Sequence, residues 1–444
     1  MPYIPHTDEE VREMLSTIGV DSIDDLFANI PEAARNPRMD LPEAISEPEL
    51  MRILKERLAP ADRICLSFAG GGAYHHNVPA ATWRLATRGE FLTAYTPYQA
   101  EASQGTLQAI FEYQTMMCRL TGMDVSNASM YDAASGLAEA ALMAVRKTRR
   151  MKIVAAGSVN PIHRQVVRTQ VSCQPIQVVT IDTPEGVMTP AMLDGALSDA
   201  ACLLVQYPNF YGCIEDVAAL GEKAHAAGAL LIVSAYPIAL GILRTPGELG
   251  ADICVGELQS LGIPLSFGGP HGGFMTCKND LIRQMPGRIV GMATDKEGRP
   301  GYCLTLQTRE QHIRREKATS NICSNQSLIA LAASITLALW GKQGLREIAT
   351  ACAENAHYAF DRLCALPGVT APYSAPFFNE FVIRFDPPER LTRVMAQCLA
   401  QGLQPGVPLS RFGLPAPADL LVAATEVNLK SDIDTLVDFV GGVK

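Results

Sequence analysis

Residues 251–276 read ADICVGELQSLGIPLSFGGPHGGFMT, and this stretch decides the fold. The apolar run Ile253–Val255 predicts a buried strand, and a second strand is predicted at Gly273–Thr276 after a glycine-rich turn. The loop between them begins Glu257-Leu258-Gln259-Ser260-Leu261 and contains no lysine. This strand–loop–strand unit is part of a longer alternating pattern.

Working outward, strands and helices alternate over the middle of the chain. Most of the strands are continuous apolar runs, which indicates burial on both faces. They are predicted at Lys152–Ala155, Ile176–Ile181, Cys202–Gln206 and Ala229–Ser234, in addition to the two strands above. Helices are predicted between them at 133–149, 161–169, 190–199 and 214–227, and an amphipathic helix precedes them at 99–120. This rhythm predicts an α/β fold with a mostly parallel, doubly wound sheet.

Three regions are predicted. Residues 1–60 form a helical arm that opens with a Thr7–Glu10 capping box, residues 61–340 form the large domain, and residues 341–444 form a smaller α+β domain. In the last region we expect helices at 345–366, 388–400 and 431–440 and strands at 381–385 and 420–425.

Composition excludes several classes of protein. A net charge of −9 argues against nucleic acid as a partner, and the twelve cysteines show no zinc-ligand spacing, so no metal site is predicted. The N-terminus lacks the features of a signal peptide, and the apolar runs 229–243 and 327–340 are shorter than a bilayer requires. We expect a soluble, cytoplasmic protein with no membrane contact.

Two segments that contain tyrosine could carry a binding site. Phe68–Pro79 combines three glycines with Tyr74 and His75, which can titrate or donate hydrogen bonds. Thr93–Glu101 places Tyr95, Tyr98 and Gln99 around a proline, just before a helix. A flexible turn and a packed loop anchor are the respective alternatives.

Two further segments could bind an anion. Tyr131–Gly136 opens a helix, whose N-terminus attracts phosphate, but Asp132 favours capping by the carboxylate instead. Arg309–Gln326 contains a basic cluster that includes Arg315, followed by the donors Thr319, Ser320 and Asn321. A solvated basic face is the alternative there.

These segments together resemble the glycine cleavage system P-protein family, and more narrowly its separate alpha chain, subunit 1. The strongest match is Leu306–Arg315 running into Lys317–Cys323. Other matches are Met14–Val20, Thr93–Gly105, Phe111–Met116 and Asn127–Ser129, so the resemblance spans nearly the whole chain. One departure is Ala133-Ala134-Ser135, where the family pattern suggests a Gly-Ala-Thr-like run.

The resemblance implies the fold type I architecture of enzymes that use pyridoxal phosphate (PLP). In that fold the loop after Ile253–Val255 presents a lysine to PLP, and an aspartate at the end of a central strand holds its ring nitrogen. Here the loop has no amine, and the strand ends with Ser234. Lys278 and Lys317 are the alternative lysines, and both lie outside the usual position.

The family therefore implies a division of labour. PLP would be carried by a homologous beta chain in an α2β2 assembly, which decarboxylates glycine and passes the aminomethyl group to the lipoyl arm of H-protein. This chain would be inactive alone and contain no catalytic residue. Thr319, Ser320 and Asn321 would reach the partner's PLP phosphate, and the substrate pocket would include Tyr95, Tyr98, Gln99, Tyr74, His75 and Arg315.

Two other functions stay open at this point. The chain could be a self-sufficient PLP-dependent aminotransferase or lyase that uses an unusual lysine. It could also be a non-catalytic scaffold that only stabilises a partner. Covalently bound PLP in the isolated chain would indicate the former.

Overall fold

The computed structural model describes residues 5–35, 37–307 and 311–443. Its contacts divide the chain into two compact units, Met1–Asp62 and Arg63–Lys444. The first unit contains α1 (Asp8–Ile18), η1 (Asp24–Phe27), η2 (Glu32–Ala34) and α2 (Glu47–Asp62). Thr7 and Glu10 form the predicted capping box at the start of α1. None of α1, η1 and η2 contains a buried residue, so these helices have no core of their own.

The second unit is built on a seven-stranded sheet in the order β2-β8-β7-β6-β5-β3-β4. Strands β3 to β7 run parallel to one another, whereas β8 pairs antiparallel with both β7 and β2. The strands are β2 (Val125–Ser126), β3 (Lys152–Ala156), β4 (Gln177–Ile181), β5 (Cys202–Tyr207), β6 (Leu230–Ala235), β7 (Ile253–Glu257) and β8 (Gly273–Cys277). The predicted strands are confirmed to within about two residues, because continuous apolar runs are buried on both faces.

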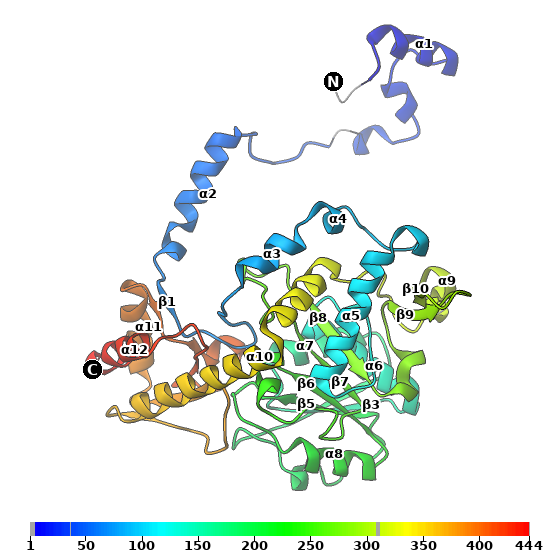
Figure 1. Cartoon of the computed structure of the whole chain (residues 1–444). Helices are drawn as coiled ribbons and strands as arrows, with labels where there is room; N and C mark the ends of the chain where they lie inside the picture. The colour runs from blue at the N-terminus through cyan, green and yellow to red at the C-terminus, as the bar shows by residue number, and fades with distance from the viewer. Residues whose placement is uncertain (1–4, 36, 308–310, 444) are drawn as a thin grey trace. The chain divides into compact units, whose positions relative to one another are not determined.

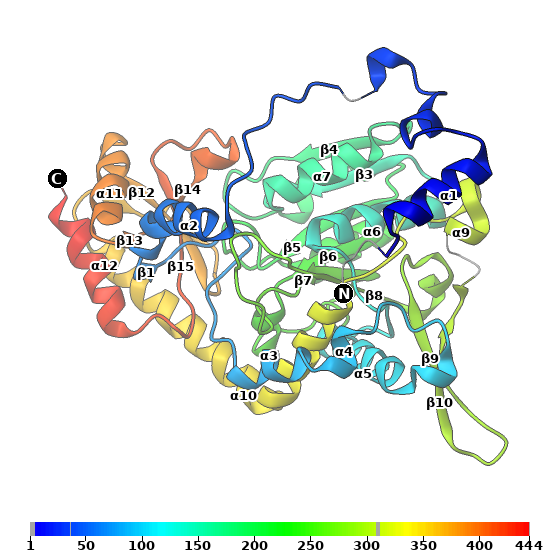
Figure 2. The ribbon, with the colours of Figure 1, turned by 90° about the horizontal axis from the view of Figure 1, so that it is seen from above.

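Helices cover this sheet as the alternation predicted. α6 (Ala133–Thr148) packs against α7 (Pro161–Val171) and against β5 to β8, and the two helices lie side by side over the sheet (Figure 2). α5 (Gln104–Thr121) and α8 (Val217–Ala226) also match their predictions. The helix predicted at 190–199 is wrong, since only η4 (Pro190–Leu193) forms there. Gly195 and Asp199 adopt positive φ angles of 74° and 56°, which a helix does not permit.

Short elements connect these layers. They are α3 (Ala80–Ala86), α4 (Gly89–Leu92), η3 (Ala100–Ala102), η5 (Pro237–Gly241), η6 (Asn279–Gln284), α9 (Gln311–Arg314) and η8 (Arg315–Lys317). An antiparallel hairpin of β9 (Ile289–Thr294) and β10 (Pro300–Thr305) was not predicted, because its residues alternate weakly and lie largely exposed.

One long helix, α10 (Ser327–Cys364), leads from the large sheet towards the C-terminal helices (Figure 1). It is interrupted at Gly341, whose φ of 59° and ψ of −172° are not helical. Among the described residues, only α10 is long and apolar enough to cross a membrane by length and composition. Its inner face packs against α3, α5 and η5, and core helices of soluble proteins share these properties.

The C-terminal part has its own sheet, β11-β12-β15-β14, and its own hydrophobic core. Its elements are β11 (Val369–Thr370), β12 (Glu380–Phe385), α11 (Glu389–Ala400), β13 (Leu403–Gln404), β14 (Val407–Pro408), η9 (Leu409–Phe412), β15 (Asp419–Ala423) and α12 (Lys430–Gly442). β13 pairs with β1 (Leu66–Ser67). The division into 61–340 and 341–444 stays a prediction, because contacts group residues 63–444 as one unit and α10 runs through the expected boundary.

Candidate functional site

The candidate site lies where the parallel strands of the large sheet end. In doubly wound sheets, ligands bind outside the carboxyl ends of the strands. Here Ser234 is the last residue but one of β6, and it is buried beside Gln206 and Val255 on the neighbouring strands. β7 ends with Glu257, and the N-terminus of α6 lies next to it.

Two carboxylates of this chain occupy the N-terminus of α6. Asp132 accepts a hydrogen bond from the backbone N–H of Ser135 at 2.7 Å, which makes it the N-cap. Glu257 accepts from the N–H groups of Ala133 at 3.1 Å, Gly272 at 3.2 Å and Leu258 at 3.2 Å. The donors that a helix N-terminus offers to a phosphate are thus already bound.

The position of Glu257 changes its acidity. Burial raises the pKa of the Glu257 carboxyl group to about 8. The Asp132 charge adds to this effect, whereas the three N–H donors oppose it. His163 also lies near Asp132, and burial lowers its pKa to about 4, so this imidazole is neutral at pH 7.

This acidity predicts how stability depends on pH. Between about pH 5 and pH 8, native Glu257 holds a proton that the unfolded chain has lost, so the free energy of unfolding should fall as pH rises. The slope from one such group approaches about 1.4 kcal/mol per pH unit. We expect Glu257→Gln to flatten the slope in urea titrations, and the exposed control Glu354→Gln to leave it unchanged. Equal slopes for wild type and Glu257→Gln would contradict the raised pKa.

The loop after β7 is fastened to the glycine-rich segment 68–79. The side chain of Gln259 accepts from the backbone N–H of Tyr74 at 2.9 Å and donates to the Tyr74 carbonyl at 2.9 Å. The Tyr74 hydroxyl donates to Glu380 at 2.8 Å, and the Gly71 N–H donates to the same carboxylate at 2.6 Å. A side chain at position 70 would overlap Glu380, which explains the glycine there. Burial raises the pKa of Glu380 to about 7. We call these contacts of Gln259, Tyr74 and Glu380 the Tyr74 clasp.

A second buried cluster adjoins the Tyr74 clasp through the ring contact between Tyr74 and Tyr236. His76 Nδ1 contacts Glu426 at 2.7 Å, and its Nε2 contacts the Tyr236 hydroxyl. The Cys352 thiol donates to Glu426 at 3.3 Å. Burial alone would raise the pKa of Glu426, but the bonds from His76 and Asn77 hold it below its ordinary value. His76, Cys352 and Glu426 offer donor atoms within 4.8 Å of one another, which is close enough for a metal ion, although hydrogen bonds already satisfy the imidazole and the carboxylate.

The structure separates the predicted site residues into three groups. In the first group, Tyr74 is buried in the clasp, whereas the neighbouring His75 is exposed. Partial burial of its ring and, as the smaller cause, the proximity of His76 lower the pKa of His75. Tyr74 therefore supports the fold of the segment and does not face solvent in this chain.

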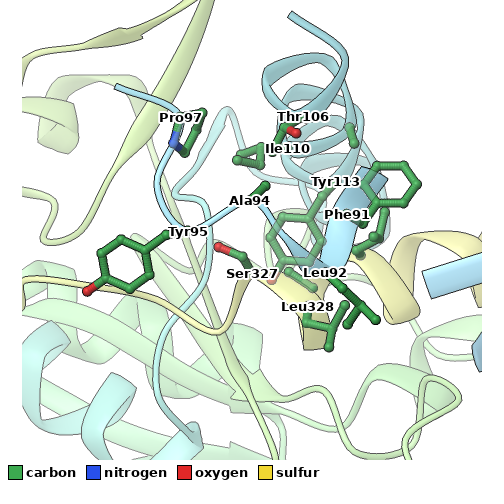
Figure 3. A pocket seen from close by; sticks show the side chains of 13 residues that line it. Phe91, Leu92, Ala94, Tyr95, Pro97, Thr106, Ile110, Tyr113, Ser327 and Leu328 are labelled. Atoms are coloured by element: carbon green, nitrogen blue, oxygen red, sulfur yellow. The ribbon is translucent and has the colours of Figure 1, made fainter. Parts of the chain in front are cut away.

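The second group lies on the surface around the loop 93–99. Tyr95 is 85% exposed, Tyr98 is 53% exposed and Gln99 is exposed. Tyr95 borders an apolar pocket formed by α4, α5 and the start of α10, yet its ring points away from the pocket's interior (Figure 3). The pocket residues include Phe91, Leu92, Ile110, Tyr113 and Leu328.

The third group is the segment after the basic cluster. Thr319, Ser320 and Asn321 line a polar pocket with Glu139 and Arg146 of α6, and Ser320 hydrogen-bonds Glu139. Burial raises the pKa of Glu139. Arg315 is exposed in η8 and borders a different hollow. The three groups are thus not one site within a single chain.

Several residues that build the site were missed from the sequence. Glu380 and Glu426 lie more than 300 residues from Tyr74 and His76, so no local spacing connects them. Gln259 and Glu257 were named only as members of a loop that contains no lysine, and no role was predicted for either side chain. Lys278 forms an ion pair with Asp252 at 2.8 Å, just before the start of β7. It therefore lies at the opposite ends of the parallel strands from the candidate site. Lys317 is exposed in η8.

Comparison with known proteins first defines the class. A glutamate decarboxylase of Lactobacillus brevis has a TM-score of 0.68 at 14% identity, covering 93% of this chain and 97% of that one. A sphingosine-1-phosphate lyase of Burkholderia pseudomallei has a TM-score of 0.63 at 16% identity, with 93% and 94% covered. The fold is that of the PLP-dependent enzymes of fold type I, which confirms the predicted fold class.

Closer relatives define the family. The glycine cleavage system P-protein family matches residues 1–440. A probable glycine dehydrogenase (decarboxylating) subunit 1 of Thermomicrobium roseum is 51% identical over 444 residues, covering 99% of this chain and 98% of that protein. An inhibitor-bound glycine decarboxylase (P-protein) of the glycine cleavage system has a TM-score of 0.89 at 43% identity, with both chains fully covered. The chain belongs to the glycine cleavage system P-protein family.

The residues at the strand ends do not fit PLP in this chain. Glu257 and Asp132 take the donors that a cofactor phosphate needs, and the charge of Asp132 would repel a phosphate. Ser234 carries no charge for a ring nitrogen, and the side chain of Gln259 is bound to the Tyr74 backbone.

Proposed function

We propose that this chain is subunit 1 of a heteromeric glycine decarboxylase. A homologous second subunit supplies the lysine and PLP, and two copies of each form an α2β2 enzyme in the cytoplasm. Together they decarboxylate glycine and transfer the aminomethyl group to the lipoyl arm of H-protein. The observation that carries this proposal is that Glu257 and Asp132 bind the donors at the start of α6, in a chain whose relatives are named as glycine dehydrogenase (decarboxylating) subunits.

This subunit contributes surface groups to its partner. Four exposed residues can form walls of the partner's substrate pocket: Tyr95, Tyr98, Gln99 and Arg315. His75 is also exposed and is included in this proposed pocket. Thr319, Ser320 and Asn321 donate to the partner's PLP phosphate. Tyr74 acts indirectly, by holding the glycine-rich segment. Such positioning and donor preorganisation can each be worth several kcal/mol of barrier, on the order of 3 kcal/mol per group.

Co-expression with the lysine-bearing subunit tests the division of labour. We expect the two chains to co-purify, with PLP bound to the pair and absent from this chain alone. Glycine–bicarbonate exchange should require both chains. A borohydride-trapped PLP adduct on the isolated chain, or exchange without the second chain, would refute the proposal and favour a self-sufficient PLP enzyme.

Asn321→Ala in the reconstituted pair tests the donor role. Loss of one preorganised donor is expected to lower the exchange rate by roughly 10- to 100-fold, while co-purification is unchanged. Gln170→Ala, a change in the same polar pocket outside the proposed donor set, is the matched control. A wild-type rate for Asn321→Ala would remove the cross-subunit role and leave a scaffold.

A further inference from the structure

Arg288 is a buried cation that contacts no carboxylate among the residues that the structure describes. It lies just before β9 and is 7% exposed. Its Nη1 donates to Asn325 Oδ1 at 3.1 Å, and its Nη2 donates to the Tyr98 hydroxyl at 3.3 Å, so both acceptors are neutral. Its Nε is buried without a partner. Within the described part of the chain, Arg288 forms no ion pair.

An isolated buried charge is unusual. Taking a guanidinium out of water is costly, and proteins normally pair it with a carboxylate. The ring of Tyr98 lies 5.6 Å from the guanidinium carbon, a cation–π contact that offsets only part of this cost. The free chain therefore holds a positive charge that an anion would neutralise.

The surroundings hold this arginine in a fixed position. Asn325 is itself oriented by a bond from its Nδ2 to Ser129 Oγ at 3.0 Å, and the N–H of Gln326 donates to the same oxygen at 2.9 Å. Ser129 has a φ of 151°, a conformation rare outside glycine. Asn127 donates to the Pro286 carbonyl at 3.1 Å, which fastens the turn that carries Arg288. Strain and fixed donors of this kind gather at binding sites.

We propose that Arg288 and Tyr98 form a subsite for an oxyanion at the contact with the second subunit. The Tyr98 hydroxyl accepts from Arg288, so its own proton remains available to the anion. Tyr98 is half exposed, so a group arriving from outside reaches this hydroxyl first. The oxyanion is the phosphate of the partner's PLP or the carboxylate of glycine. The inference rests on the proposed function.

The first test measures the Tm of the isolated chain, because a binding residue and a purely structural residue predict opposite changes in Tm when Arg288 is replaced. In the isolated chain, Arg288→Met should leave the Tm unchanged or raise it, because an unpaired buried charge is removed. In the reconstituted pair, the same change should lower glycine–bicarbonate exchange at least tenfold. Arg390→Met is the matched control, since Arg390 is equally buried but donates to the carbonyls of Val440 and Val443, and it should lower the Tm.

The second test identifies the anion. A weaker apparent affinity of the Arg288→Met pair for PLP, with the KM for glycine unchanged, assigns the subsite to phosphate. A higher KM for glycine at saturating PLP assigns it to the carboxylate. Arg288→Lys, which retains the charge, should recover part of either loss.

Failure is distinguishable from failure of the proposed function. An inactive wild-type pair would refute the function itself. An active wild-type pair with an equally active Arg288→Met pair would overturn only the subsite. A lower Tm of the isolated Arg288→Met chain would also overturn it, because the arginine would then be a structural clasp.

Discussion

Gly212→Ala is expected to destabilise the chain by about 3 kcal/mol or more, among the largest effects of a single methyl group. Gly212 has a φ of 84°, and a Cβ there would overlap the carbonyl group of Glu380. Neither atom can move easily, because Glu380 begins β12 and the Gly212 carbonyl accepts from Phe378 N–H at 3.2 Å. Urea unfolding of the isolated chain measures the loss.

Gly195→Ala separates the overlap from the backbone strain. Gly195 has a similar φ of 74°, but nothing lies within 4 Å of the position that its Cβ would take. It should cost about 1–2 kcal/mol, the price of a left-handed residue alone. Equal losses at both positions would show that the close approach of the Gly212 turn to β12 is not maintained in solution.

Glu257→Ala is expected to have the second large effect. It leaves the N–H groups of Ala133, Leu258 and Gly272 without their acceptor. Each unsatisfied buried donor costs about 1–3 kcal/mol, so the free energy of unfolding should fall by roughly 3 kcal/mol. Inorganic phosphate should restore part of the loss, because these donors and the start of α6 form an anion site once the carboxylate is gone.

The phosphate response needs its own control. Glu248→Ala also removes an acceptor for a backbone N–H, that of Thr245, but at an exposed position. Its loss should be small and insensitive to phosphate. If phosphate stabilises wild type and Glu257→Ala equally, the carboxylate does not occupy the anion position.

The sheet was predictable because its signal is local. Continuous apolar runs such as Cys202–Gln206 are typical of strands buried on both faces of a mostly parallel sheet, and six of the seven strands of the large sheet were predicted. The helix expected at 190–199 failed at Gly195 and Asp199, where positive φ angles end it. The β9–β10 hairpin carries little hydrophobic pattern and gave no comparable signal.

The candidate site was only partly predictable. The missing lysine and the capping role of Asp132 follow from residues adjacent in sequence, and the capping is confirmed. The clasp of Gln259, Tyr74 and Glu380 joins residues that only the folded chain brings together. Arg288 was not singled out, because burial without a counter-charge is a property of the fold and leaves no mark in local spacing.

The contacts at the ends of β6 and β7 also bear on whether a lysine there could hold a cofactor. A lysine placed in the β7–β8 loop would have to replace or displace Gln259, whose side chain is hydrogen-bonded to the Tyr74 backbone. Glu257 and Asp132 would still bind the N–H groups at the start of α6, and Ser234 would still carry no charge. No single codon change reverses all of these. A lysine in this loop would therefore not restore a PLP site in this chain by itself.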